Sequence, residues 1–350
     1  MKRAALLGGA ALAALAALEV ALRLASYSTP QLHQLDVELG WSLRANKSGS
    51  YAAQDGRIGV AINSAGFRDR EHLLDKPDPV YRIAVLGDEY SEAMGVALRD
   101  TWWWRLELEL QRCDFQPGKL VEVLNFGVAG YGTAQELVLL QRTAMRYAPD
   151  LVLLQFSADD VIDNSFALAP NKLRPFYFLD AHGVPRIDES FAAAPDFARR
   201  MQTRYRLAAE LADHTRVLEL VRELARETFI PPAHAETDPA LAAPPRDALH
   251  EEAWRVTDAL IAKAADYARR NGAELALVVV PPARQAGEAT SYADQRLAAL
   301  GTKLQMPVIS LGGGLQSVQY GRTGEWTPAG HRAAADLIAH RLCRATPQPG

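Results

Sequence analysis

Short apolar runs alternate with amphipathic stretches through most of the chain. The runs are short and end at glycine or proline, which is typical of buried strands, and the apolar spacing between them is that of a helix face. The expected strands are 82–87, 121–127, 151–156, 275–280 and 307–311, and the expected helical stretches are 106–110, 133–147, 254–271 and 328–343. This alternation predicts an α/β fold with a central parallel sheet, whose sites form at the carboxyl ends of the strands.

The N-terminus has the pattern of a membrane-targeting segment. A basic start, Lys2-Arg3, precedes an apolar stretch over 4–22 in which Glu19 is the only acid. A spanning helix needs about 20 apolar residues, so this stretch is long enough. We expect residues 1–25 to form an uncleaved single-pass anchor in a bacterial inner membrane, with a cytoplasmic N-terminus and a periplasmic main domain. A cleaved signal peptide, with its cleavage site near Ala25-Ser26, is the alternative.

The rest of the chain divides by composition. Residues 26–80 are polar and turn-rich, which indicates an extended lead-in that wraps the domain formed by 81–345. Residues 166–249 interrupt the alternation of strands and helices. They contain a helical segment at 204–228 and a linker rich in proline and alanine at 230–245. We expect this insertion to cap one edge of the sheet or to contact a partner.

Composition excludes several classes of protein. With 350 residues, 49% of them hydrophobic and 23% charged, the chain has ample material for a core and is not a disordered protein. A net charge of −4 argues against a nucleic-acid binder. Cys113 and Cys343 are the only cysteines, too few for a disulfide scaffold or a four-cysteine zinc site. We expect two separate buried thiols, although the sequence leaves their pairing open.

Five segments follow the motif order of a known family. They are Asn63–Asp69, Arg82–Glu92, Leu124–Gly132, Pro149–Asp160 and Gly324–His331. Together they resemble the SGNH (GDSL-type) hydrolase family in its membrane-anchored bacterial branch. The resemblance implies a flavodoxin-like three-layer sandwich that acts as an esterase, a lipase or an O-acyl transfer enzyme. It also implies a Ser nucleophile in a Gly-Asp-Ser turn, an oxyanion hole built with a Gly and an Asn, and an Asp and a His near the C-terminus.

The catalytic positions of that family are substituted here. Glu89 stands at the nucleophile, Thr323 at the triad Asp and Glu325 at the triad His. Glu89 has no hydroxyl, and carboxylate attack on an ester would give an anhydride. The ordinary pKa of Glu, about 4.3, is far from the pKa of about 6.5 that suits a His base. Ser91 is a poor substitute, because the turn aims position 89 at the site, and His331 matches a non-catalytic position.

The expected oxyanion hole is altered as well. Gly127 is retained, but Asp159 replaces the Asn amide donor with an acceptor that repels a developing oxyanion. We therefore treat both positions as vestigial.

The substitutions gather four carboxylates, Asp88, Glu89, Asp159 and Glu325, at one strand-end cleft. Such a group could bind a divalent cation through oxygen, or act as a paired acid and base. The simpler expectation is a vestigial cleft whose carboxylates are solvated or bound to backbone N–H groups, with no metal and no cofactor.

Two further motifs have simple structural explanations. Trp102, Trp103 and Trp104 cannot all face one side of a helix, since neighbours are about 100° apart, so at least one should lie at the surface. These three residues are candidate contacts for a partner or for the membrane interface, with core packing as the alternative. Gly312–Gly314 is interpreted as a turn, because a phosphate cradle requires a fuller motif.

Together these features predict a catalytically degenerate, membrane-anchored protein, a pseudohydrolase. Its expected role is a structural or accessory subunit of a membrane-associated complex, in contact with other membrane proteins and not with nucleic acid. An acyl esterase or O-acyltransferase acting on envelope polysaccharide or lipid is one alternative, and a carboxylate-based metal or glycan site is another.

Overall fold

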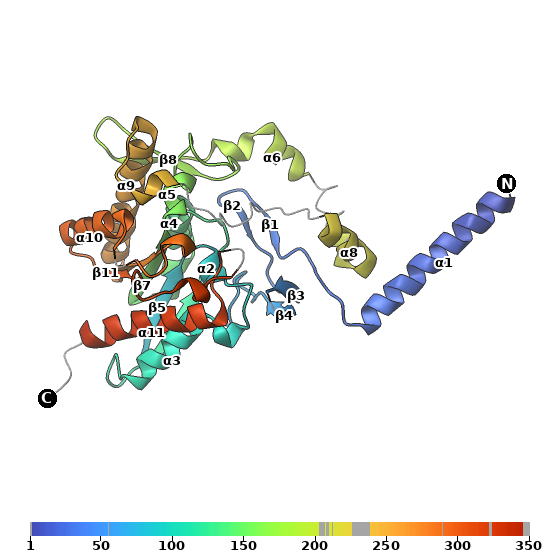
Figure 1. Ribbon diagram of the computed structural model, residues 1–350, viewed down its shortest axis with the longest axis horizontal. Coiled ribbons are helices and arrows are strands. Elements are labelled where there is room, and N and C mark those ends of the chain that lie inside the picture. The colour runs from blue at the N-terminus through green and yellow to red at the C-terminus, as the bar shows by residue number, and fades with distance from the viewer. Residues whose placement is uncertain are drawn as a thin grey trace.

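A five-stranded parallel sheet forms the centre of the protein (Figure 1). The computed structural model describes residues 2–54, 56–202, 207, 210–211, 213–225, 239–288, 290–321 and 324–345. The strands are β5 (Val80–Leu86), β6 (Leu120–Asn125), β7 (Leu151–Ser157), β10 (Glu274–Val280) and β11 (Val308–Ser310). They lie in the order β6-β5-β7-β10-β11, the flavodoxin-like order 2-1-3-4-5 when numbered along the chain. The α/β fold with a central parallel sheet is confirmed, and all of the expected strands are present.

Helices cover both faces of this sheet. One face carries α3 (Trp102–Arg112) and α11 (Pro328–Ala345), and the other carries α4 (Thr133–Arg142), α9 (Ala248–Arg270) and α10 (Tyr292–Leu304). Successive strand residues point to opposite faces, so Ile83 packs in one hydrophobic cluster and Ala84 in the other. Because both faces of the sheet are buried, the sequences of the strands are continuous apolar runs.

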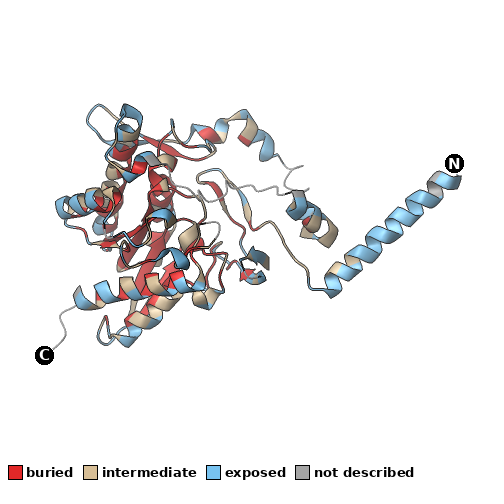
Figure 2. Ribbon diagram, in the orientation of Figure 1, coloured by how far each residue is buried: buried red, intermediate tan, exposed pale blue. Residues whose placement is uncertain are grey.

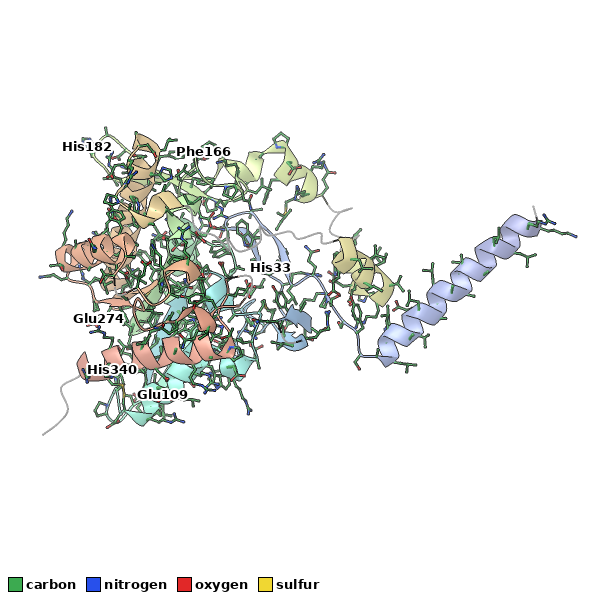
Figure 3. All side chains as sticks on the ribbon, in the orientation of Figure 1. His33, Glu109, Phe166, His182, Glu274 and His340 are labelled. Atoms are coloured by element: carbon green, nitrogen blue, oxygen red, sulfur yellow. A yellow bond between two sulfur atoms is a disulfide. The ribbon has the colours of Figure 1, made fainter. Side chains whose placement is uncertain are left out.

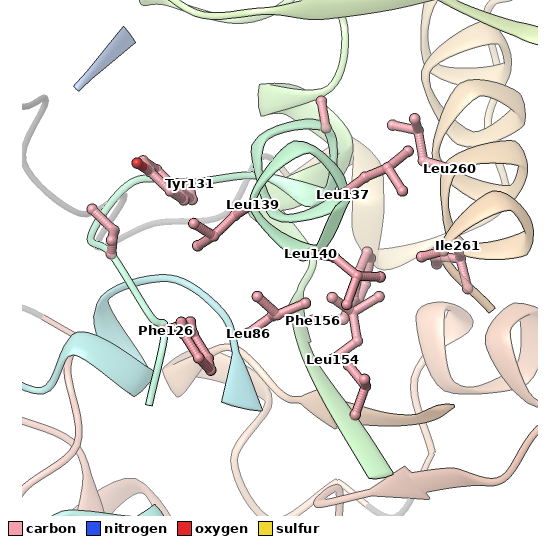
Figure 4. Packing of buried hydrophobic residues seen from close by; sticks show 14 of the residues in the cluster. Leu86, Phe126, Tyr131, Leu137, Leu139, Leu140, Leu154, Phe156, Leu260 and Ile261 are labelled. Carbon is pink, nitrogen blue, oxygen red and sulfur yellow. The ribbon is translucent and has the colours of Figure 1, made fainter. Parts of the chain in front are cut away.

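The larger of the two clusters lies between the sheet and the helices α4 and α9 (Figure 4). Leu154 and Phe156 of β7 point toward Leu140 of α4 and Ile261 of α9. All four side chains are buried, and burial is concentrated in the sheet and the helix faces turned toward it (Figure 2).

The tryptophans of α3 divide between core and surface. Trp102 and Trp103 are fully buried, and the indole N–H of Trp103 donates to the Ser91 carbonyl at 2.9 Å. Trp104 is partly exposed, with the Arg70 guanidinium 4.9 Å from its ring centroid. The hypothesis of a partner or membrane contact is therefore wrong for Trp102 and Trp103, because they fill the space between α3 and its neighbours. Trp104 is the only one of the three at the surface.

Cys113 and Cys343 form a disulfide with a Cα–Cα distance of 6.2 Å. The expectation of two separate buried thiols is wrong. Cys113 follows α3 directly and Cys343 lies in the last turn of α11, and these two helices pack against each other. The cysteines therefore meet although 230 residues separate them.

The lead-in forms two antiparallel hairpins. They are β1 (His33–Asp36) with β2 (Gly40–Leu43), and β3 (Ser48–Ala53) with β4 (Gly56–Ala61). Trp41, Leu43 and Val60 from these hairpins are buried in the same cluster as the sheet. This segment therefore belongs to the core and also carries side chains to the site described below.

The insertion packs mainly on helices. It contains β8 (Phe176–Leu179), β9 (Pro185–Asp188), α6 (Pro195–Arg200) and α8 (Arg216–Ala225). The β8–β9 hairpin lies against α9, where Lys263 donates to the Pro185 carbonyl at 3.3 Å. This position differs from the expected cap on an edge of the sheet, where β6 and β11 lie. Residues 226–238, which include much of the expected linker, lie outside the described residues.

The N-terminal helix α1 (Lys2–Leu24) extends away from the domain and is exposed along nearly its whole length (Figures 1 and 2). Its stretch Leu6–Leu24 is long and apolar enough to cross a membrane.

The short helices are α2 (Glu89–Glu92) and α5 (Asp159–Asp163), and the 3-10 turns are η1 (Leu98–Asp100), η2 (Ala144–Tyr147), η3 (Ser190–Ala193), η4 (Pro239–Ala242), η5 (Ala283–Gln285) and η6 (Ser317–Gln319). Gly312–Gly314 forms a turn, as expected.

Candidate functional site

The candidate site lies where β5 and β7 end. These parallel neighbours stand at the point where the strand order reverses, which is where open α/β sheets form their ligand crevice. Gly87-Asp88-Glu89 follows β5, and Asp159 follows β7. The loop after β6 is bound to the turn after β5, because the backbone N–H of Val128 donates to the Gly87 carbonyl at 3.0 Å.

Asp88 fixes the turn after β5. It is the N-cap of α2, and its carboxylate accepts from the Tyr90 N–H and the Ser157 hydroxyl, each at 2.9 Å. Burial raises the pKa of Asp88 to about 6. A side chain at Gly87 would place its Cβ 2.3 Å from Gln155 Oε1, so this close approach requires glycine. The turn is therefore held rigidly, with position 89 as the first residue of α2.

Glu89, where the motif resemblance implies the nucleophile, is partly buried. Its carboxylate accepts from the Gly130 backbone N–H at 3.3 Å. Loss of hydration, together with the carboxylates of Asp88 and Asp159, raises the pKa of Glu89 well above its usual range. A backbone donor of the site is already bound to this side chain.

The structure does not support Gly127 as an oxyanion-hole donor. The Gly127 N–H donates to Asn125 Oδ1 at 3.0 Å, and a Cβ on Gly127 would lie 2.4 Å from the Ser91 Cβ. Gly127 is thus a close-packing glycine, and Gly130 is the residue whose N–H faces Glu89. The sequence analysis missed Gly130; the signal was a second glycine three positions further along the same loop.

Ser91 is not placed to act as a nucleophile. Its side chain is fully buried, and its hydroxyl donates to Gln155 Oε1 at 2.9 Å.

The tail contributes Glu325, whereas Thr323 lies outside the described residues. Glu325 Oε2 packs against Gly95, 3.1 Å from the position of a Cβ there. Burial and the nearby Glu92 carboxylate raise the pKa of Glu325. In the described part of the chain, no hydrogen bond joins Glu325 to Glu89, so these two carboxyl groups do not form a directly bonded acid–base pair.

The lead-in supplies two side chains that the sequence analysis did not identify. His33 Nε2 lies 3.1 Å from Oε2 of Glu92, which is itself buried in α2 (Figure 3). Tyr51 of β3 stands near Glu325 and Glu92, and partial burial and these carboxylates raise the pKa of its hydroxyl. No local pattern could have found these contacts, since the hairpins reach the site only through tertiary packing.

Two further carboxyl groups near Asp88 are buried. Asp160 accepts from the Ser157 N–H at 3.2 Å, whereas neither oxygen of Glu136 has a hydrogen-bond partner. Burial and neighbouring carboxylates, Glu136 for Asp160 and Asp88 for Glu136, raise the pKa of both groups. The interior behind Asp88 therefore favours protonated acids over carboxylate anions.

The carboxylates do not converge on a metal position. Among the described residues, no group of three or more His, Cys, Asp or Glu side chains is placed to hold a metal ion. Of the candidates Asp88, Glu89, Asp159 and Glu325, the first is occupied by Tyr90 and Ser157, and the last packs against Gly95.

His331 has a structural role in this arrangement. It is buried in α11, and its Nδ1 accepts the Trp102 backbone N–H at 3.3 Å, at the start of α3. Burial, together with the charges of Arg68 and Arg105, lowers the pKa of His331 to about 3. The neutral ring thus joins α11 to α3.

Arg68, from the motif Asn63–Asp69, stabilises the turn that contains Asp88 and Glu89. Its buried guanidinium donates to the carbonyls of Glu92 at 3.2 Å, Ala93 and Val96. These carbonyls lie at the end of α2 and in the loop that follows, so the motif holds the turn from behind.

Comparison with known proteins gives similarity at the level of structure. No protein-family model matches the sequence, and no curated protein matches it. The chain is similar to TesA (14% identity, TM-score 0.41, 75% of this chain and 97% of that one). It is also similar to Axe2, an acetylxylan esterase from Geobacillus stearothermophilus (9%, 0.41, 75% and 94%), and to a GDSL-like lipase from Bacteroides thetaiotaomicron (14%, 0.34, 76% and 89%). At these identities and TM-scores, nothing that these proteins act on is carried over to this chain.

Proposed function

We propose that this chain is a catalytically degenerate SGNH-hydrolase-like protein that serves as a structural or accessory subunit beside a membrane. The observation that carries the proposal is Glu89. A carboxyl group stands at the nucleophile position and binds the Gly130 N–H, a donor that an acyl-transfer enzyme would direct at a developing oxyanion.

The surroundings of Glu89 support the same conclusion. A serine-type mechanism needs a hydroxyl, a base near neutral pKa and a group that orients the base. The chain has Glu325 and Thr323 at the base and orienting positions, and the nearest hydroxyl in the turn, that of Ser91, is buried. Asp88 and Arg68 fix the shape of the turn, so the proposed loss of hydrolase activity is compatible with an ordered turn.

The membrane location of the proposal rests on α1 and on the disulfide. The stretch Leu6–Leu24 is exposed and apolar, and Lys2 and Arg3 precede it, which favours a cytoplasmic N-terminus. The Cys113–Cys343 disulfide favours an oxidising compartment such as the periplasm. We therefore propose a single-pass anchor with the domain on the outer side of the inner membrane.

The proposed absence of hydrolase activity is tested with the full chain in mild detergent. We expect no hydrolysis of p-nitrophenyl acetate above the background of Glu89→Ala, and no labelling by a fluorophosphonate. Ser91→Ala is the control for a displaced nucleophile. Hydrolysis that disappears in Glu89→Ala would overturn the proposal in favour of an acyl esterase, the alternative that the motif resemblance implies.

The accessory role is tested by affinity capture of the tagged full chain from its native membranes. We expect one or more membrane proteins at a fixed stoichiometry, absent when an unrelated single-pass protein carries the same tag. Recovery of the chain alone would count against a subunit role and would direct attention to acylated envelope substrates.

A further inference from the structure

Helix α8 lies against the end of α1 that adjoins the domain (Figure 1). The Val217 backbone N–H at the start of α8 donates to Glu19 Oε2 at 3.0 Å. The Arg23 guanidinium donates to the His214 carbonyl at 2.7 Å. Glu19 and Arg23 lie in the last two turns of α1, so these contacts fix α8 at the level where the apolar stretch ends.

The polar face of α8 is occupied by the protein itself. Glu219 is fully buried and accepts the Thr29 N–H at 2.7 Å, and Arg222 donates to the Thr29 carbonyl at 3.0 Å. Glu223 binds Arg57 at 2.9 Å. These bonds hold α8 in one rotation about its axis, and they determine which face is turned outward.

The outward face is apolar. Leu218, Val221 and Leu224 recur every three residues, which places them on one side of the helix. Their exposed fractions are 47%, 55% and 73%. Leu211, a few residues before α8, is exposed as well. Single exposed leucines are ordinary, whereas a continuous apolar helix face marks an interaction surface.

We infer that this face of α8 lies in the membrane–water interface of the bilayer that α1 crosses. At the end of α1 that α8 contacts, the apolar side chains of Leu18, Val20 and Leu24 are also exposed. A helix with a fixed polar face and an apolar opposite face binds such an interface about 5–10 Å deep. Residues 218–224 therefore form a second membrane contact that holds the domain at a set orientation to the lipid surface. This inference rests on the proposed membrane anchor.

The test uses the full chain in phospholipid nanodiscs and a fluorescent NBD label on single introduced cysteines. The two native cysteines are paired, so an introduced cysteine is the reactive thiol. Leu218→Cys reports on α8, and Leu15→Cys reports on the span. Leu108→Cys on α3 is the matched control, because Leu108 and Leu218 have the same exposed fraction of 47%. Val221→Cys repeats the measurement one turn further along the same face.

We expect spin-labelled lipids to quench the labels at 15, 218 and 221 at least about twofold more than the label at 108, as for an interfacial helix. Quenching at 15 without quenching at 218 and 221 would overturn the inference while leaving the anchor in place. A blue shift at 218 without lipid quenching would overturn it in favour of a protein occupant, such as a second copy. Absence of quenching at 15 would overturn both the inference and the anchor.

Discussion

Glu89 determines the chemistry available at the candidate site. The motif resemblance implies a hydroxyl at this position, whereas this chain has a carboxyl group, which accepts the Gly130 N–H. Asp88 caps α2 and Gly87 permits the close approach of Gln155, so both residues hold the turn around Glu89 in place. The loss of hydrolase chemistry that we propose therefore needs no change in the fold.

The raised pKa of Glu89 gives a pH-dependent prediction for stability. A carboxyl whose pKa is raised in the folded state stabilises the protein at low pH, and this contribution is lost as the pH rises through the folded pKa. Glu89→Gln should therefore gain stability relative to the native chain as the pH rises from 4.5 to 7.5, because glutamine has no proton to lose. Urea unfolding at both pH values measures the difference. The exposed Glu274→Gln is the control, and an equal gain there would contradict the explanation.

His331 gives a prediction with the opposite sign. Its pKa is lowered to about 3, so its contribution is present above pH 6.5 and is lost as the pH falls toward 3. His331→Leu should reduce the free energy of unfolding at pH 7.5 by about 1–3 kcal/mol, because the Trp102 N–H loses its acceptor. The deficit should shrink at pH 5. Thermal unfolding checks this, with the exposed His340→Leu of the same helix as control; a deficit that grows at pH 5 would contradict it.

At the scale of elements, α3 and α11 form one layer that is joined in two places. His331 connects the start of α3 to α11, and the disulfide connects the ends of the same two helices. The buried Trp102 and Trp103 fill the interior of this layer. Packing between these helices therefore joins the segment after β5, the first strand of the sheet in the chain, to the segment after β11, the last.

Removing the disulfide should weaken the connection between α3 and α11 and so destabilise the protein. Replacing Cys113 and Cys343 by Ser should lower the free energy of unfolding by about 2–4 kcal/mol, since the bond restricts a long loop of the unfolded chain. Urea unfolding compares the double variant with the native chain, with and without reductant. The native chain with reductant should behave as the double variant does. Equal stability of the oxidised native chain and the double variant would contradict the prediction.

At the scale of the whole molecule, the α/β domain and α1 meet through α8. Glu19 and Arg23 contact the insertion, and the segment after α1 continues into the two hairpins that carry His33 and Tyr51 to the candidate site. The candidate site, the insertion and the proposed anchor are therefore connected through residues 19–61.

Retention of α1 is a testable property of the mature protein. We expect the intact mass of the chain from native membranes to include residues 2–24, and carbonate washing to leave it in the membrane. Protease added to spheroplasts should degrade the domain, whereas intact cells should protect it. A mature chain that begins near Ser26 would show that the segment is a cleaved signal instead.

Much of the architecture is determined by local sequence. The apolar runs predict all five strands, because strands buried on both faces need unbroken apolar residues. The motifs after β5 and β7 predict that Glu89 and Asp159 share one edge of the sheet, since parallel strands end at the same edge. The expected start of the last helix at residue 328 is also correct, and the Thr327 hydroxyl before it accepts the Gly330 N–H at 3.3 Å.

Only the tertiary structure decides which groups meet across the chain. The pairing of Cys113 with Cys343 depends on the packing of α3 against α11, and no local pattern records it. The same holds for His33 beside Glu92, and for the choice of Gly130 over Gly127 as the donor that faces Glu89. Sequence determines periodicity, caps and turns because these depend on near neighbours. Contacts between distant segments depend on the relative placement of whole elements, which is fixed when their apolar faces pack.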